Sequence, residues 1–214
     1  MSVIVAKKVR DGYIVAGDSQ ATAGDEKNTV NKLFKAYKDD DVIIGVVGTL
    51  RDANIMMTVS GLLDPNAIRR DELDLLSIIL YTVPAIKKAI KENEHAIIEN
   101  GMLEWDSQII LLYKDKCFEI DSDFSVMEID EFGAIGSPSK YAKGAYEMVK
   151  KYRSMIKKSD REIVKDIVKM TIDKTAYVGY PIKVLDNTKD KEFEVIYGRY
   201  EEIRDIREKS QKDE

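Results

Sequence analysis

The strongest constraint on the fold of this chain is an uninterrupted apolar run, VIIGVV, at residues 42–47. The run has the length of a β-strand, and the charged segment KDDD at 38–41 before it predicts a turn. A strand that lacks alternating polar residues is typical of a sheet whose two faces are both covered. We therefore expect a layered fold that buries this strand.

Blocks of strands alternate with pairs of helices along the chain. Periodicity and turn residues predict strands at 3–9, 13–16, 32–37, 42–47, 107–113, 117–120, 132–135, 180–185 and 192–197. They predict helices at 50–63, 71–99, 138–157 and 160–176, with a kink or break at Pro84 in the second helix. The polar stretch 17–28 is expected to form a loop.

This order predicts an α+β fold, a four-layer αββα sandwich in which two antiparallel sheets pack together and a helix pair flanks each sheet. Hydrophobic residues make up 44% of the 214 residues, which is enough for a substantial core. No linker or repeat divides the chain, so we expect one domain over residues 1–208. The charged segment 209–214 is expected to be a disordered tail.

The composition argues against several classes of function. The net charge is −5 with acids and bases interspersed, which disfavours nucleic acids and anionic membranes as partners. Cys117 is the only cysteine, so it can form neither an intrachain disulfide nor a cysteine metal cluster. His95, the only histidine, lies in a charged segment that predicts a solvated helix face. We expect no metal and no cofactor.

The sequence also bears on localisation. No apolar stretch is long enough to span a membrane. Lys7 and Lys8 interrupt the opening apolar run, which argues against a signal peptide. We therefore expect a cytoplasmic protein.

Ser2 is the candidate nucleophile. Its small side chain favours removal of Met1, after which Ser2 carries a free α-amino group beside its hydroxyl. An N-terminal amine titrates near pH 8, so at neutral pH a useful fraction can act as a base. A hydroxyl beside its own base is the amine-activated counterpart of a serine triad. Many chains begin with Met-Ser without such a role, so the case for Ser2 as a nucleophile depends on residues farther along the chain.

Three residues at predicted strand ends provide the supports that this nucleophile needs: a carboxylate, a cation and a backbone donor. Asp18 ends the second strand, which pairs with the first and brings it near Ser2. Lys32 opens the next strand, and Gly48 follows the apolar run, where a bare backbone can approach a substrate. Each residue alone has a non-catalytic explanation: Asp18 could cap a turn, Lys32 could be one of the 34 basic residues, and Gly48 could serve packing only. Their joint occurrence favours catalysis.

Five segments in order resemble the proteasome β-subunit and the HslV-type protease, which are N-terminal nucleophile (Ntn) hydrolases. They are AGDSQATAG at 16–24, NKLFK at 31–35, GVVG at 45–48 with Asp52 after it, AIGSPS at 134–139, and Asp173 at a helix-to-strand junction. Each segment alone is a weak signal. Five in the right order, with the expected elements between them, are specific over residues 2 to 185.

The resemblance implies a role for each matched residue. Ser2 would be nucleophile and base, and Lys32, held by Asp18, would lower the pKa of its hydroxyl. The Gly48 N–H would stabilise the oxyanion. The residues implied in substrate binding, through backbone hydrogen bonds or in the pocket beside the scissile bond, are Ala21, Thr22, Val30 and Thr49.

Amine positioning is implied for Ser137, supported by Asp173. The chain departs from the family at two places. Most members have threonine where Ser2 stands, and the missing methyl group removes a constraint on the rotation of the hydroxyl. A second serine of the family is unmatched, because Ala176 stands there with Thr175 beside it. The network that positions the amine is therefore in question.

These residues predict an Ntn endopeptidase of the threonine or serine type that cleaves peptide bonds through a Ser2 acyl-enzyme. The resemblance implies peptide or unfolded-protein substrates, a homo-oligomeric ring and an ATP-dependent unfoldase as partner. Two alternatives remain open. A peptide ligase or transpeptidase would pass the same acyl group to an amine, and a non-catalytic ring subunit would retain Met1. The presence of both Asp18 and Lys32 argues against the non-catalytic subunit.

Overall fold

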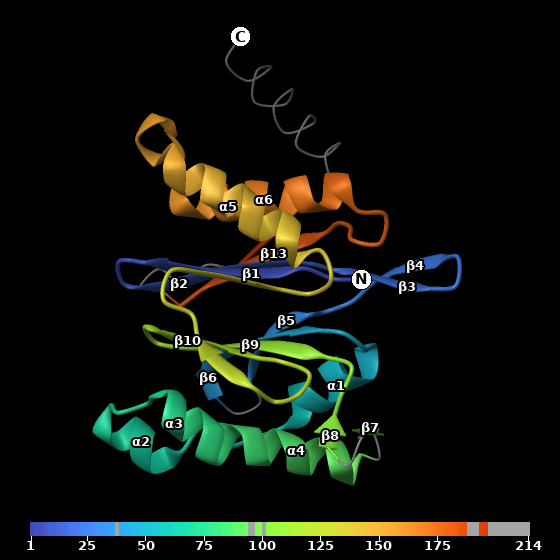
Figure 1. The fold of residues 1–214 in the computed structure, drawn as a ribbon, viewed down its shortest axis with the longest axis vertical. Coiled ribbons are helices and arrows are strands. Elements are labelled where there is room, and N and C mark those ends of the chain that lie inside the picture. The colour runs from blue at the N-terminus through green and yellow to red at the C-terminus, as the bar shows by residue number, and fades with distance from the viewer. Residues whose placement is uncertain (37–38, 94–96, 100–101, 188–192, 197–214) are drawn as a thin grey trace.

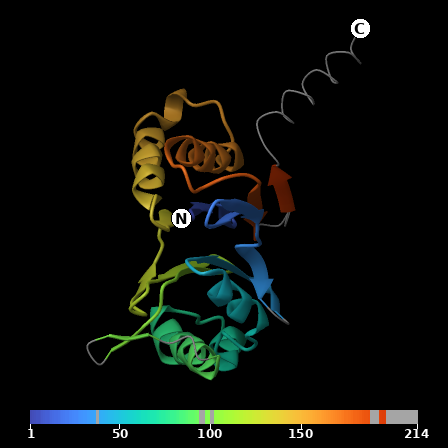
Figure 2. The same cartoon turned by 90° about the vertical axis from the view of Figure 1, so that its right-hand side faces the viewer.

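The computed structural model describes residues 1–36, 39–93, 97–99, 102–187 and 193–196. Two five-stranded sheets lie face to face, with helices on the outer side of each (Figure 1). Figure 2 shows the same four layers from the side, with the yellow and orange helices at one end and the green ones at the other. The predicted α+β class and αββα sandwich are confirmed.

The first sheet contains the N-terminal strand in its interior. Its strands are β1 (Ile4–Val9), β2 (Gly12–Asp18), β12 (Phe132–Ile135), β13 (Ile182–Asp186) and β14 (Phe193–Ile196). They run in the order β12-β1-β2-β13-β14, and each neighbouring pair is antiparallel. The start of the chain is thus held on both sides, by β2 and by β12.

The second sheet contains the apolar run. Its strands are β5 (Leu33–Ala36), β6 (Asp39–Val47), β9 (Gln108–Tyr113), β10 (Lys116–Ile120) and β11 (Val126–Glu128). They run in the order β11-β10-β9-β6-β5. Val42 and Val46 face the helices, whereas Ile43 and Val47 face the first sheet. Burial on both faces explains why residues 42–47 show no alternation of polar and apolar residues.

Helices cover the outer face of each sheet. The first sheet is covered by α5 (Ser139–Lys151) and α6 (Asp160–Lys174), which are joined through the 3-10 turn η2 (Arg153–Met155). The segments outside the second sheet are α1 (Leu50–Thr58), α2 (Pro65–Arg70), α3 (Leu75–Ser77), the π-helical turn η1 (Ile78–Thr82), α4 (Val83–Glu92), and the hairpin β7 (Ile97–Glu99) and β8 (Met102–Glu104). No helix in the described part of the chain combines the length and the apolar character needed to cross a bilayer.

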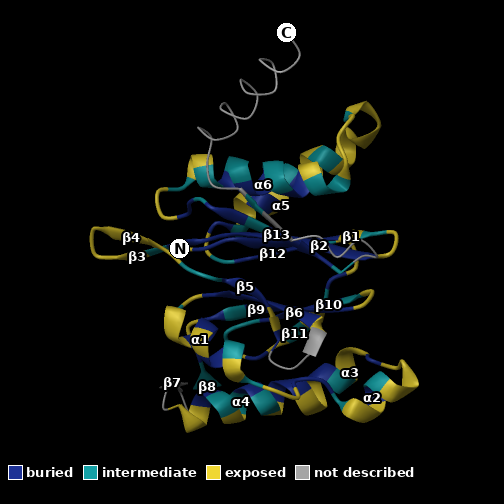
Figure 3. Cartoon of the chain, turned by 180° about the vertical axis from the view of Figure 1, so that it is seen from behind, coloured by how far each residue is buried: buried dark blue, intermediate teal, exposed yellow. Residues whose placement is uncertain are grey.

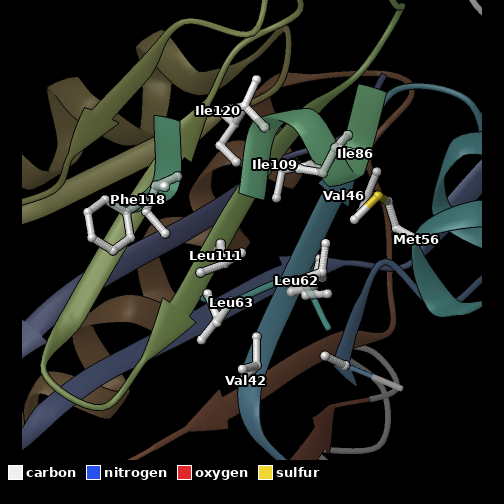
Figure 4. Close-up of a cluster of buried hydrophobic side chains, with 14 of the residues drawn as sticks. Val42, Val46, Met56, Leu62, Leu63, Ile86, Ile109, Leu111, Phe118 and Ile120 are labelled. Atoms are coloured by element: carbon white, nitrogen blue, oxygen red, sulfur yellow. The ribbon is translucent and has the colours of Figure 1, made fainter. Parts of the chain in front are cut away.

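Three apolar clusters hold the layers together, and buried residues concentrate in the sheets and on the inner faces of the helices (Figure 3). The largest lies between the second sheet and its helices, where Met56 and Ile86 meet Val46 and Leu111 (Figure 4). Cys117 is fully buried in the cluster between the two sheets, as its predicted strand position indicates.

Two polar segments differ from their predictions. The stretch expected to be a loop contains a hairpin, β3 (Gln20–Ala23) and β4 (Glu26–Thr29), that projects beyond the sandwich (Figure 1). Most of its residues are exposed, so no alternation marks them as strands. Asp39 to Asp41, expected in a turn, belong to β6. Lys38, His95 and the predicted tail 209–214 lie outside the described residues.

The helix boundaries also differ. The helix predicted to reach residue 63 ends at Thr58, and a new helix begins after Asp64, which caps it with Pro65 in its first turn. The helix predicted over 71–99 is divided into α3, η1 and α4. The break expected near Pro84 is a π-helical turn immediately before α4. Both strands of the β7–β8 hairpin and β11 are too short for their periodicity to predict them.

Candidate active site

An ion pair between Asp18 and Lys32 lies at the centre of the candidate site. Asp18 ends β2 and is 1% exposed, and Lys32 precedes β5 and is 6% exposed. Lys32 Nζ is 2.9 Å from Asp18 Oδ2 and 3.0 Å from Oδ1, and it also donates to the carbonyl of Gln20 at 2.5 Å. The strand ends therefore bring these two predicted residues into direct contact.

Backbone donors fix the Asp18 carboxylate. It accepts the N–H of Val3 at 3.0 Å, of Gln20 at 3.2 Å and of Gly179 at 3.3 Å. The bond from Val3 is the important one, because Val3 follows Ser2 directly. The carboxylate that holds Lys32 thus also holds the backbone of the candidate nucleophile.

Burial changes the proton affinity of both partners. Burial lowers the pKa of the Lys32 ammonium, and the Asp18 carboxylate opposes that shift. Burial also raises the pKa of the Asp18 carboxyl, against the effects of Lys32 and of the Val3 N–H. The difference in proton affinity between the two groups is therefore smaller than in water, which suits a site where protons move.

Ser2 opens onto a cavity of about 400 Å³. Ser2 itself is 8% exposed, whereas Met1 is 62% exposed and also lines the cavity. Lys32 and Gly48 lie on the same cavity. All the residues predicted to bind substrate line it as well, namely Ala21, Thr22, Val30 and Thr49. The structure therefore gathers the predicted nucleophile, cation, oxyanion donor and substrate residues around one space.

A second cavity, of about 430 Å³, lies on the other side of Ser2 and Gly48 and is lined by Ser137. Gly136 brings Ser137 there. A β-carbon on Gly136 would lie 1.9 Å from the Ser2 carbonyl oxygen, and its φ is +96°, so the end of β12 fits against Ser2 only with glycine. Ser137 thus lines the same cavity as Met1 and Ser2.

Asp173 is farther from this arrangement. It lies in the last turn of α6 and is exposed, and it is absent from the described residues that line the two cavities. The neighbouring Thr175 hydroxyl donates to the carbonyl of Thr171 at 2.7 Å, so its proton is used at the helix end. Thr175 therefore does not replace the missing serine at Ala176 as a donor to the Ser2 amine.

Ser107 and Asp52 brace Gly48; the sequence analysis named Asp52 only as part of the family resemblance and missed Ser107. Ser107 donates to Asp52 Oδ2 at 2.6 Å and accepts the Thr49 N–H at 3.2 Å. Asp52 is fully buried, and its backbone N–H donates to Thr49 Oγ1 at 3.1 Å. A β-carbon on Gly48, whose φ is +134°, would lie 2.1 Å from Ser107 Oγ. Asp52 was marked in the sequence by its place after the GVVG segment, and the structure adds that its side chain is buried.

Gln108 follows Ser107 and is the first residue of β9, and it braces the opposite side of the site. Its Oε1 accepts the N–H of Gly136 at 2.8 Å, and its Nε2 donates to Asp121 Oδ1 at 2.9 Å. Ser107 and Gln108 thus fix the Gly48 loop and the Ser137 loop from one strand end. Nothing in the sequence alone distinguishes Gln108 from other polar residues.

The described residues bring together no group of three or more histidine, cysteine, aspartate or glutamate side chains that could hold a metal ion. The polar groups near Ser2 are the Lys32 ammonium with its Asp18 carboxylate, backbone amides and hydroxyls, and the second cavity is also lined by Glu104, Asp106 and Asp121. This donor set suits acid–base and nucleophilic chemistry.

Comparison with known proteins bears on the family resemblance and on the fold. No family model matches the chain. Over 186 residues it is 25% identical to the ATP-dependent protease subunit HslV of Campylobacter hominis, which covers 85% of this chain and 93% of that protein. In sequence and in fold the chain resembles the proteasome β-subunit and HslV family of Ntn hydrolases. The αββα sandwich is the fold of this family.

Solved structures share the fold of this chain. The HslV of Trypanosoma brucei superimposes with a TM-score of 0.58 at 22% identity, over 86% of this chain and 99% of that one. Thiobacillus denitrificans BPH in complex with epoxomicin gives a TM-score of 0.65 at 16% identity, over 86% and 97%. An Anbu mutant from Hyphomicrobium sp. strain MC1 also gives 0.65 at 16% identity.

Proposed function

We propose that the chain is an Ntn peptidase that cleaves peptide bonds through an acyl-enzyme on Ser2, once Met1 has been removed. One observation carries the proposal: Ser2 shares a cavity with the buried ammonium of Lys32 and with the Gly48 backbone. The buried Asp18–Lys32 pair supports it further. Such a pair costs desolvation energy, and a subunit without catalysis gains little from placing it behind its N-terminus.

Acylation follows from the groups around Ser2. The free amine takes the proton of the Ser2 hydroxyl, and Oγ attacks the peptide carbonyl. The Lys32 ammonium favours the alkoxide character of Oγ, and the Gly48 N–H stabilises the oxyanion. The amine then gives its proton to the leaving nitrogen as the C–N bond breaks. The product is an ester between Ser2 and the acyl part of the substrate.

In deacylation, water takes the place of the Ser2 hydroxyl as the nucleophile, and Ser2 Oγ becomes the leaving group. The amine takes a proton from water, whose oxygen attacks the ester carbonyl, and the proton passes to Oγ as the ester bond breaks. Ser137, next to Ser2 in the second cavity, and Asp173 are proposed to orient the amine and its proton. An attacking amine in place of water would give the transfer reaction of a ligase.

The cavity suits an apolar side chain of the substrate. Its walls include Ala21, Val30, Val46 and Ala53, which leave room because they are small or of medium size. Strand β3 of the exposed hairpin borders the same cavity, with Thr22 at its centre. We infer that an extended peptide adds beside β3 and Gly48 and places an aliphatic side chain in the cavity.

Assembly and partners extend the proposal. The Campylobacter hominis relative is named as a subunit of an ATP-dependent protease. We infer that this chain also acts as a homo-oligomeric ring in the cytoplasm and receives unfolded protein from an ATP-dependent unfoldase. Sedimentation of the purified chain tests the ring, since a monomer at micromolar concentration would contradict it.

Intact mass of the purified protein, before and after a peptide epoxyketone, tests the catalytic proposal. The reagent captures a terminal amine together with its neighbouring hydroxyl. We expect loss of Met1 and one adduct, and no adduct on Ser2→Ala. Retained Met1 without an adduct would favour the non-catalytic subunit. An adduct with exchange between two peptides, but without net hydrolysis, would favour the ligase.

A further inference from the structure

A third cavity, of about 640 Å³, opens at the edge of the sandwich and is separate from the two cavities beside Ser2. It lies between the two sheets, where β5 and β6 of the second sheet face β13 of the first. The buried side chains of Leu33, Ile43 and Leu185 form its apolar walls. The volume falls within the range of about 300–1,000 Å³ that is usual for small-molecule sites.

Lys183 occupies an unusual position in this cavity. Along β13, Ile182 and Val184 pack beneath the helices of the first sheet, while Leu185 packs between the sheets. Alternation in a strand places Lys183 on the same side as Leu185. A lysine therefore stands on the inner face of the sandwich, where an apolar residue is expected, and it lines the cavity.

The Lys183 ammonium has a neutral partner. It donates to Asn31 Oδ1 at 2.7 Å, and no carboxylate lies within ion-pair distance of it among the described residues. Burial lowers the pKa of Lys183, and no acidic group opposes the shift. The other lining cation at this end, Lys114, is paired with Asp71 at 2.8 Å.

Acidic residues at the rim are engaged elsewhere. Asp186, which also lines the cavity, forms an ion pair with Arg161. Asp41 and Lys35, farther along the rim, each have an interaction of their own. The cavity therefore combines apolar walls with one ammonium whose charge is not balanced by a described carboxylate. A half-buried charge of this kind is stabilised by a counter-charge.

We propose that the cavity binds a small aliphatic carboxylate, with its hydrocarbon chain against Leu33, Ile43 and Leu185 and its carboxylate on Lys183. The chain replaces water on the apolar walls, and the carboxylate supplies the missing counter-charge. An uncharged aliphatic molecule makes the same apolar contacts with the walls, but it provides no counter-charge for the Lys183 ammonium. The proposal does not depend on peptidase activity, because the cavity and its residues are distinct from those around Ser2.

Calorimetric titration of the full chain with decanoate, below its micelle concentration, tests this site, with decanol as the uncharged comparison. We expect decanoate to bind one site per chain, and Lys183→Met to weaken it about tenfold or more. Decanol should bind Lys183→Met and the unaltered chain about equally. Lys114→Met is the matched control, because it removes a lining cation that already has a partner, and its affinity should stay within about twofold.

A second measurement covers the case in which Lys183→Met alters the fold. Brief modification of the unaltered chain with an amine-acylating reagent, followed by peptide mapping, reports the reactivity of each lysine. We expect decanoate to protect Lys183 and not Lys114. No binding of decanoate, equal binding by Lys183→Met, or protection of neither lysine would each overturn the proposal. If decanoate does not bind at all, the edge of the sandwich is closed by another part of the chain or by a protein partner.

Discussion

The hydroxyl of Ser107 joins a buried carboxylate to the loop that contains Gly48. Ser107→Ala removes its bonds to Asp52 and to the Thr49 N–H. Because the oxyanion donor acts mainly in the transition state, we expect kcat for peptide cleavage to fall about tenfold. KM should change less than about twofold. Steady-state kinetics measure both.

The control for this prediction is Ser60→Ala, which removes an exposed serine after α1. It should leave kcat and KM unchanged. A fall in thermal stability of Ser107→Ala with unchanged kcat would mean that the brace only stabilises the fold. Asp52→Asn keeps the shape of the side chain, and we expect it to retain more activity than Ser107→Ala.

Lys32→Met separates catalysis from stability at the buried ion pair. It leaves the Asp18 carboxylate, 1% exposed, without its cation. We expect the free energy of unfolding to fall by about 3–5 kcal/mol and the epoxyketone adduct to disappear. The double variant Asp18→Asn/Lys32→Met removes both charges, so it should regain most of the stability and none of the reactivity. Chemical denaturation and intact mass check the two effects.

The same pair predicts a pH dependence. Burial raises the pKa of Asp18, and Lys32→Met removes the ammonium that opposes this shift. A carboxyl with a raised pKa binds its proton more tightly in the folded state, so folding is favoured at low pH and loses stability as pH rises. Compared with the double variant, Lys32→Met should be least destabilised below about pH 4 and progressively more so above it. If the difference in stability between Lys32→Met and the double variant did not change with pH, the raised pKa of Asp18 would be contradicted.

At the scale of the element, helix α6 depends on its first residues. Ser159 caps the helix and forms a capping box with Glu162. Ser159→Ala should lower the free energy of unfolding by about 1 kcal/mol, as measured by denaturant titration. Ser154→Ala, in the exposed 3-10 turn before it, has no such role and should change the stability by less than about 0.5 kcal/mol. Equal losses would show that the box is not formed in solution.

The elements that the sequence predicts are those whose environment leaves a local pattern. The buried strand β6 and the capped helix α6 carry such patterns in consecutive residues. The β3–β4 hairpin carries none, because most of its residues are exposed, and the π-helical turn η1 has no pattern that separates it from the α-helix after it. Asp18 and Lys32 lie at strand ends, so their contact could be predicted, whereas the role of Gln108 could not, because its partner Gly136 is distant in sequence.

At the scale of the whole molecule, Cys117 reports the packing of the two sheets. It is fully buried between them, and burial raises the pKa of its thiol well above the ordinary value. A thiol reagent at pH 8 should therefore label the native protein at least about 1,000-fold more slowly than the unfolded chain. Labelling should accelerate with denaturant in parallel with global unfolding. Rapid labelling of the native protein would show that the sheets separate without unfolding, and Cys117→Ser serves as the unlabelled control.

The central position of β1 has a consequence for synthesis. Ile4 pairs with Ile135 on one side, and the Asp18 carboxylate accepts the N–H of Gly179, 161 residues farther along the chain. The residues of β1 therefore reach their places in the sheet only after segments much farther along the chain have been made. For the proposed nucleophile Ser2, a nascent chain lacks the surroundings that acylation requires. The proposed peptidase would therefore stay inactive until these distant segments have met.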